Sequence, residues 1–271
     1  MQYSVIDLQK EYGLKGGKLT AYVADTYVRP ALIIVPGGGY GFVSPREGEP
    51  IALEFFARGY NCFVLEYLIG GPNGASYPEQ LLELASAVDY VKKHAEEFRV
   101  KADEVYAMGS SAGGHIVGTL AVSYQNVAEL AGKTLDCRPT AIGLLYPVVS
   151  SIHGHQGSYN NVMYGYSDEE KAELLKTLNL NEAVTKDTPP AFLYTTAEDQ
   201  AVPADNALRY ALACARQGVL YELHVYPNGP HGLSTGKSEV NGGMKSYSPR
   251  IKNWLDDCDA FFRLCAERNK E

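Results

Sequence analysis

The amino-acid sequence predicts an α/β protein in which a mostly parallel central sheet is covered by helices on both faces. Short apolar segments alternate along the chain with amphipathic segments of helical length, as in βαβ units. Residues 31–35, Ala-Leu-Ile-Ile-Val, form a continuous apolar run, which is typical of a strand buried on both faces of a parallel sheet. Glycine-rich turns follow such runs, as at 36–40. We therefore expect residues 1–271 to form a single domain.

The first half of the chain supplies strands at 19–28, 31–35, 62–67 and 104–108. Residues 44–58 are predicted to form a helix, with Ser44 as N-cap, Pro45 in the first turn and Glu47 completing a capping box. Gly59 should end that helix. A second helix is predicted over 78–98, where apolar residues recur at helical spacing.

The second half continues the same alternation. Helices are predicted over 111–124, 203–217 and 249–268, and strands over 141–146, 191–196 and 220–225. One insertion, at about 149–187, interrupts the pattern with a His-, Gly-, Asn- and Tyr-rich loop and a short polar helix near 167–178. Because it follows a strand, this insertion should lie over the edge of the sheet at which such folds bind ligands.

Composition excludes several classes of function. A formal net charge of −8 argues against a nucleic-acid-binding surface and against a polybasic membrane contact. The five cysteines form no C-x-x-C pair, so we expect reduced, buried thiols and a cytoplasmic protein. Residues 1–10 have no apolar stretch and the chain has no long apolar run, so neither a signal peptide nor a transmembrane helix is expected.

The segment 109–113, Gly-Ser-Ser-Ala-Gly, fits the G-x-S-x-G pattern of a nucleophile. A buried strand enters it and a helix leaves it, which is the strand–turn–helix context that this strained turn requires. Ser111 would then stand at the helix N-terminus, where the dipole favours a developing anion. Ser110 is a rival, but Met108 and Ala112 stand where glycines would be needed. An N-cap role for Ser111 is the alternative.

The segment 36–40, Pro-Gly-Gly-Gly-Tyr, offers backbone N–H groups at the end of an earlier strand. We expect Gly38 and Gly39, together with Ala112, to form an oxyanion hole. A plain turn or a phosphate loop is the alternative. The latter is disfavoured because the Lys-Ser/Thr of a P-loop is missing and G-x-G-x-x-G is not matched.

A serine nucleophile needs a histidine base and a carboxylate partner. His231 follows the last predicted strand, and Asp199 follows the strand before it, so the chain order is Ser, Asp, His. Glu198 is the second candidate for the carboxylate, and capping of the helix near Pro203 is the alternative role for Asp199. The predicted chemistry is acyl transfer through an acyl-enzyme.

These motifs resemble the α/β-hydrolase superfamily, in particular small esterases related to hormone-sensitive lipase and the bacterial acetyl-xylan and carbohydrate acetyl esterases. The matching segments are 36–40, 109–113, 198–203 and 230–232. The resemblance implies the triad Ser111, Asp199 and His231, no cofactor, and a short acyl group. Lipase-like relatives usually have a histidine before the three glycines, where this chain has Pro36. The Pro-Gly-Gly-Gly-Tyr stretch is closer to the acetyl-esterase branch, and the segment 155–161 also resembles that branch.

The substrate is expected to be a small ester, with an acetylated sugar as the candidate, since sugar rings stack on aromatic faces and bind amides through their hydroxyls. Tyr40, Tyr159, Asn160 and Tyr164 are the candidate contacts.

No metal is expected, because two loop histidines at 153 and 155 lack a third ligand of suitable spacing. An amidase such as an arylformamidase, a small peptidase, and a non-catalytic receptor of the same fold are the alternatives. A homodimer is the expected assembly.

Overall fold

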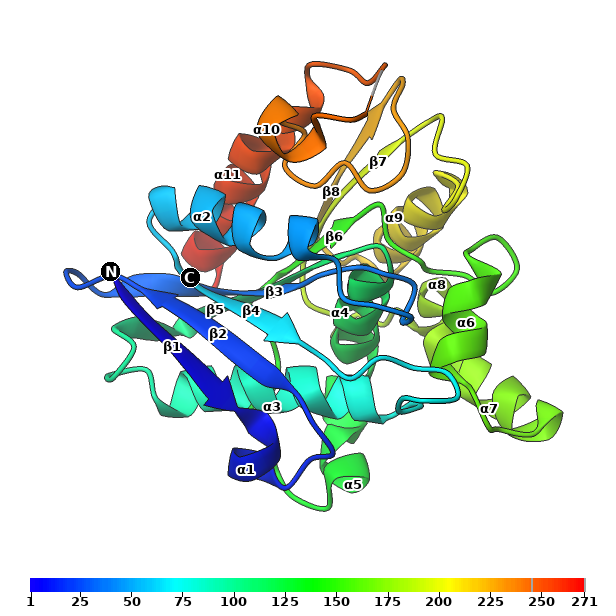
Figure 1. The fold of residues 1–271 in the computed structure, drawn as a ribbon, viewed down its shortest axis with the longest axis horizontal. Helices are drawn as coiled ribbons and strands as arrows, with labels where there is room; N and C mark the ends of the chain where they lie inside the picture. The colour runs from blue at the N-terminus through cyan, green and yellow to red at the C-terminus, as the bar shows by residue number, and fades with distance from the viewer. Residues whose placement is uncertain (245, 271) are drawn as a thin grey trace.

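A computed structural model describes residues 1–244 and 246–270, which form one eight-stranded sheet in the order β1-β2-β4-β3-β5-β6-β7-β8 (Figure 1). Strands β3 to β8 are parallel, and β1 and β2 add an antiparallel edge. The strands are Gln2–Asp7 (β1), Lys18–Val23 (β2), Arg29–Val35 (β3), Asn61–Glu66 (β4), Val100–Ser110 (β5), Ile142–Leu145 (β6), Ala191–Thr196 (β7) and Tyr221–Tyr226 (β8). The predicted mostly parallel α/β sheet is confirmed.

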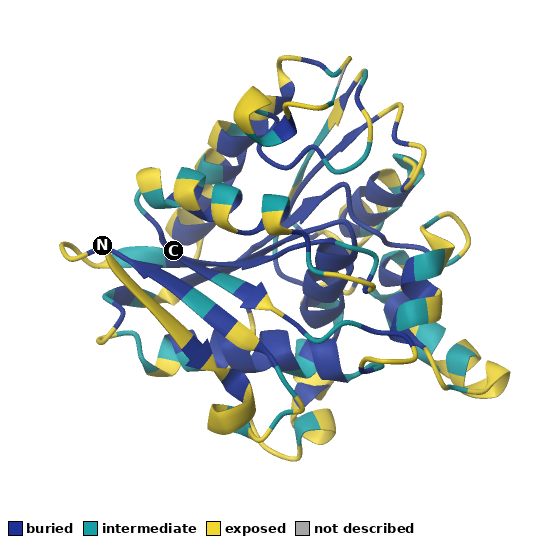
Figure 2. Ribbon diagram, viewed as in Figure 1, coloured by how far each residue is buried: buried dark blue, intermediate teal, exposed yellow. Residues whose placement is uncertain are grey.

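Helices cover both faces of the sheet. They are Leu8–Tyr12 (α1), Glu49–Ala57 (α2), Glu79–Lys93 (α3), Ala112–Ser123 (α4), Val127–Ala131 (α5), Gln156–Val162 (α6), Asp168–Leu178 (α7), Leu180–Ala183 (α8), Asp205–Gln217 (α9), Ser238–Asn241 (α10) and Trp254–Arg268 (α11). Apolar residues of α3, α4 and α9 share one core with the sheet, and those of α2 and α11 share the other. The central strands are therefore buried on both sides, whereas β1 is largely exposed (Figure 2).

The register of the central strands positions the loops that follow them. β3 lies between β4 and β5, and Val35 pairs with Gly109 in a parallel arrangement. The glycine-rich segment after β3 and the segment after β5 therefore leave the sheet side by side. This pairing brings two of the predicted motifs together although about 70 residues separate them in the chain.

Several predicted boundaries were wrong. The first strand ends at Val23 rather than at 28, because the chain turns through Tyr27 at a φ of 47° into β3. β1 and α1 were not predicted at all. The predicted helix over 44–58 is divided into a 3₁₀ turn at Pro45–Glu47 and α2. Its capping box does not form, because Ser44 makes no cap hydrogen bond and the Glu47 carboxylate points to other partners.

The insertion folds into α6, α7 and α8. The predicted polar helix is α7, where Ser167 and Glu170 complete a capping box. All five cysteines are buried and free. Within residues 1–244 and 246–270, no helix has both the length and the apolar character needed to cross a membrane.

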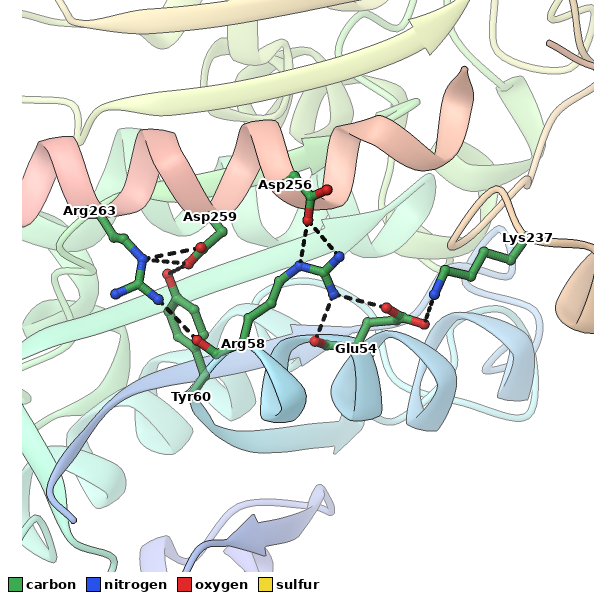
Figure 3. A network of polar contacts seen from close by, with 7 residues as sticks. All are labelled: Glu54, Arg58, Tyr60, Lys237, Asp256, Asp259 and Arg263. Atoms are coloured by element: carbon green, nitrogen blue, oxygen red, sulfur yellow. Dashed lines mark hydrogen bonds and ion pairs between the residues drawn. The ribbon is translucent and has the colours of Figure 1, made fainter. Parts of the chain in front are cut away.

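Helix α2 is attached to α11 and to the segment before α10 by a network of charged side chains (Figure 3). Arg58 binds Glu54 at 2.9 Å and Asp256 at 2.7 Å, and Lys237 also contacts Glu54. Burial works to raise the pKa of Glu54, but hydrogen bonds from Lys237 and Arg58 outweigh it and hold that pKa below its usual range. The network fixes α2, which directly follows the segment that carries Glu47.

Candidate active site

Ser111 lies at a sharp turn between β5 and α4, with φ 53° and ψ −117°. This conformation is strained for a residue with a side chain, and the two flanking glycines make it possible. A Cβ on Gly109 would lie 2.2 Å from the Gly113 carbonyl oxygen, and a Cβ on Gly113 would lie 2.1 Å from that of Val35. The Gly-x-Ser-x-Gly pattern therefore follows from close backbone packing that leaves no room for a Cβ.

His231 lies between Ser111 and Asp199. Its Nε2 is 2.8 Å from Ser111 Oγ, and its Nδ1 is 2.6 Å from Asp199 Oδ2. Asp199 is only 3% exposed, and a carboxylate at Nδ1 fixes the tautomer in which Nε2 can accept a proton from the serine hydroxyl. The three residues come from the ends of β5, β7 and β8. The structure therefore brings together the three residues that the sequence predicted.

The structure also shows what becomes of the two alternatives, a capping role for Asp199 and Glu198 as the carboxylate partner of the histidine. Asp199 also accepts backbone N–H bonds from Ala201 and Val202 with its Oδ1, so the turn-capping interaction exists alongside the contact with His231. Glu198 instead accepts from the Gly229 N–H at 3.3 Å. Glu198 thus supports the loop that carries His231 and does not touch the imidazole.

The glycine-rich segment after β3 places two backbone N–H donors at the cavity that Ser111 also lines. Gly38 and Gly39 have φ values of 128° and 61°, and a Cβ on Gly38 would lie 2.0 Å from the Phe42 carbonyl oxygen. Their N–H groups have no protein acceptor within the described part of the chain. Ala112 opens α4, where the first N–H groups of a helix have no acceptor within the helix. The three donors are therefore available to an anionic oxygen.

Glu47 is a feature of the site that the sequence analysis misassigned. Its carboxylate is 4% exposed and accepts from the Gly37 N–H at 2.9 Å and from the Tyr146 hydroxyl at 2.7 Å. The Tyr146 oxygen in turn accepts from the Ser234 N–H, and its ring lies 5.0 Å from that of His231. Burial and then the Glu47 charge raise the pKa of Tyr146 well above its ordinary value, so this hydroxyl stays a donor.

Arg46, the residue before Glu47, binds the loop that follows β8. Its Nη2 donates to the Gly232 carbonyl oxygen at 3.0 Å, and its Nε donates to that of Val240 at 3.2 Å. The Ser234 hydroxyl donates back to the Arg46 carbonyl oxygen. Arg46 and Glu47 together therefore link the glycine-rich segment to the loop after β8.

A cavity of about 290 Å³ opens above Ser111. It is lined by Gly38, Gly39, Phe42, Ser44, Arg46, Glu47, Ser111, His155, Ala201, Val202, His231 and Gly232. Phe42 is 61% exposed, and the insertion contributes His155. The cavity is small, partly apolar and open to solvent on one side, so it can admit a short acyl group together with part of its alcohol.

The four residues predicted to contact substrate are not brought to this cavity. The side chains of Tyr40 and Tyr159 are buried, and those of Asn160 and Tyr164 are exposed on the surface of the insertion. None of the four lines the cavity. The structure therefore does not place the four predicted residues at this cavity, and Phe42 and His155 line it instead.

Tyr40 and Tyr159 pack around a buried histidine instead. The Tyr40 hydroxyl donates to His115 Nδ1 at 2.7 Å, and His115 Nε2 donates to the Leu178 carbonyl oxygen at 2.8 Å. The Tyr159 hydroxyl donates to the same carbonyl oxygen at 3.1 Å. Burial lowers the pKa of His115 to about 4, so the ring is neutral at pH 7 and serves the packing of the insertion.

The remaining histidines lie apart from Ser111 or make other contacts. His224 binds Glu222 on β8, and His153 lies 3.5 Å from Asp205. Over the described residues, no group of three or more His, Cys, Asp and Glu side chains is arranged to hold a metal ion.

A family model described as BD-FAE matches residues 22–212, which is more than half of the chain. The chain belongs to the BD-FAE family. The matched region contains Gly38, Gly39, Ser111 and Asp199, whereas His231 lies beyond it and is located by the structure.

Relatives of this BD-FAE chain include longer proteins. It is 32% identical, over 81% of its own length, to "Endo-1,4-beta-xylanase B" of Butyrivibrio fibrisolvens. It is 29% identical, over 76% of its length, to "Acetylxylan esterase" of Xylanibacter ruminicola. The aligned part spans only 35% and 41% of the length of these two proteins.

Solved structures match it over nearly the whole chain. An acetyl ester-xyloside bifunctional hydrolase from Caldicellulosiruptor lactoaceticus superposes with a TM-score of 0.82 at 29% identity, covering 96% of both chains. The carboxylesterase Cest-2923 from Lactobacillus plantarum superposes with a TM-score of 0.76 at 26% identity, covering 99% of this chain and 96% of its own. The fold of this BD-FAE chain is therefore that of the α/β-hydrolases.

Proposed function

We propose that this chain is a serine esterase that hydrolyses short-chain acyl esters, acetyl esters above all. The observation that carries the proposal is the pair of hydrogen bonds at His231, which accepts from the Ser111 hydroxyl at 2.8 Å and donates to Asp199 at 2.6 Å. They lie at the wall of a cavity that also exposes the Gly38 and Gly39 donors. A nucleophile, a base and an oxyanion site at one place are what acyl transfer requires.

The mechanism follows from these positions. His231 Nε2 takes the proton of Ser111 while Oγ attacks the carbonyl carbon, and the N–H groups of Gly38, Gly39 and Ala112 stabilise the oxyanion. The tetrahedral intermediate collapses when the imidazolium protonates the leaving alcohol, which leaves an acyl-serine. His231 then activates a water that attacks the acyl carbon and releases the acid. Asp199 stays ionised and stabilises the imidazolium in both halves.

The proposed substrate is an acetylated sugar, such as an acetylated xylo-oligosaccharide. The cavity holds about 290 Å³, which suits a two-carbon acyl group better than a long chain. Relatives bearing the names acetylxylan esterase and acetyl ester-xyloside hydrolase support the choice of alcohol.

Hydrolysis of p-nitrophenyl acetate, butyrate and octanoate by wild type and Ser111→Ala tests the proposal, alongside acetate release from an acetylated xylo-oligosaccharide. We expect the acetate ester to be the best of the three, and Ser111→Ala to lose activity by at least about 10³-fold. Ser110→Ala is the matched control, since this neighbouring serine does not contact His231. Retention of the wild-type rate in Ser111→Ala would disprove the assignment. Formamide hydrolysis without ester hydrolysis would indicate an amidase.

A further inference from the structure

A second hollow lies on the other side of the segment that forms one wall of the Ser111 cavity. It holds about 580 Å³ and lies against β1, β2 and the end of β4. Its lining includes Tyr3, Thr20, Tyr22, Glu49, Val64 and Glu66. Ser44 lines both this groove and the Ser111 cavity, so the two hollows adjoin across a single stretch of backbone.

The groove exists because none of the helices in the described part of the chain covers this part of the sheet. Tyr3 pairs with Tyr22, and Thr20 pairs with Val64, so these side chains stand on one face. On the opposite face the neighbouring residues of β2 and β4 are fully buried, whereas Tyr3 is 63% exposed. Helix α2 buries Cys62 at the start of β4 and leaves the end of that strand open (Figures 1 and 2).

The lining has the mixed character that a sugar requires. Val43, Val64 and Ile69 supply apolar surface, and the exposed Tyr3 supplies an aromatic face. Glu49 and Glu66 are exposed carboxylates that form no ion pair with any described residue. Burial and the Glu49 charge raise the pKa of Tyr22 to about 12, so its hydroxyl keeps its proton. The apolar C–H face of a sugar can pack on the Tyr3 ring while its hydroxyls donate to the carboxylates.

We propose that this groove binds the main chain of a neutral oligosaccharide whose acyl group lies at Ser111. The inference rests on the proposed esterase function and deepens it, because it assigns the part of the substrate that lies beyond the reacting ester. The described lining holds two carboxylates and no Lys or Arg side chain, which disfavours anionic ligands such as nucleic acid, acidic lipid or uronate-bearing sugar. Because Ser44 lines both hollows, a sugar chain that crosses this one segment would reach from the groove to the catalytic cavity.

Binding of unacetylated xylohexaose to the Ser111→Ala protein, measured by isothermal titration calorimetry, tests the groove without any catalysis. We expect saturable binding that is weaker for xylobiose, and a loss of about fivefold to tenfold in affinity when Tyr3→Ala is added. The matched control is Tyr27→Ala, since Tyr27 is also an exposed tyrosine but lies outside the groove. This control should leave the affinity unchanged. Absence of xylohexaose binding, or equal losses in both variants, would overturn the proposal.

Kinetics separate failure of the groove from failure of the esterase. In the otherwise wild-type enzyme, Tyr3→Ala should lower kcat/KM for an acetylated xylotetraose by about fivefold to tenfold and leave that for p-nitrophenyl acetate unchanged. Hydrolysis of p-nitrophenyl acetate that depends on Ser111 tests the esterase by itself. A protein that hydrolyses this ester but shows no gain in kcat/KM with the length of the sugar chain would refute the groove alone.

Discussion

Glu47 offers a direct way to test how the oxyanion donors are held in place. Its carboxylate accepts from the Gly37 N–H at 2.9 Å, next to the Gly38 and Gly39 donors, and from Tyr146, which packs on His231. Substitution Glu47→Ala leaves two buried donors without an acceptor, at a cost of about 1–3 kcal/mol for each. The N–H groups of Gly38 and Gly39 then lose the anchor that orients them.

The magnitude of the effect on catalysis follows from the oxyanion site. Loss of one oriented donor lowers kcat by about 10²–10³-fold in comparable sites, so we expect Glu47→Ala to lower kcat by about 10²-fold. KM for p-nitrophenyl acetate should change little, because the donors act mainly on the transition state. Glu47→Gln should recover about tenfold of this loss, since its amide oxygen can still accept from the Gly37 N–H. The pH profile of kcat/KM should keep its shape in Glu47→Gln, because Glu47 is a positioning residue and transfers no proton.

The assay compares kcat, KM and the thermal midpoint of unfolding for wild type, Glu47→Ala and Glu47→Gln. Glu49→Ala and Glu49→Gln are the matched controls, because Glu49 is an exposed glutamate two residues further on that lies outside the Ser111 cavity. They should keep kcat on p-nitrophenyl acetate. A folded Glu47→Ala protein with kcat within threefold of wild type would refute the reasoning, as would a loss confined to KM.

Three further predictions concern single residues. Asp199→Asn should lower kcat by about 10⁴-fold, because an amide no longer fixes the imidazole tautomer or stabilises the imidazolium; a loss below tenfold in steady-state assays would contradict this role. Gly38→Ala should abolish most activity in a protein that still folds, since its Cβ would lie 2.0 Å from the Phe42 carbonyl oxygen; wild-type turnover would show that the loop tolerates another conformation. The folded-state pKa of His115 is lowered from 6.5 to about 4, so the unfolded chain binds the extra proton between these values. The stability that His115 contributes is therefore present above pH 6.5 and lost as the pH falls towards 4, and urea unfolding of His115→Phe across this range should show a flatter pH dependence than wild type.

The sequence predicted those parts of the site that depend on local patterns and on strand order. The Gly109–Gly113 turn could be recognised because its glycines, the strand before it and the helix after it are contiguous. Asp199 and His231 could be recognised because the ends of parallel strands meet at one edge of the sheet, so residues that follow β7 and β8 come near those that follow β5.

The part that the sequence could not predict depends on contacts between distant segments. Glu47 fitted the spacing of a capping box, but its carboxylate binds Gly37 and Tyr146, which lie 10 and 99 residues away. Tyr40 adjoins the glycine loop in sequence, yet a positive φ of 60° turns its ring into the core against His115. The homodimer and the cytoplasmic location stay predictions.

The identity of the nucleophile is tested most directly by covalent trapping. Diethyl p-nitrophenyl phosphate transfers a diethylphosphoryl group to an activated serine and releases p-nitrophenol, and peptide mass spectrometry locates the modified residue. We predict one label per chain, at Ser111, formed in proportion to the loss of esterase activity and absent from Ser111→Ala. A label at Ser110 or elsewhere that accompanies inactivation, or an active enzyme with Ser111 fully labelled, would contradict the account.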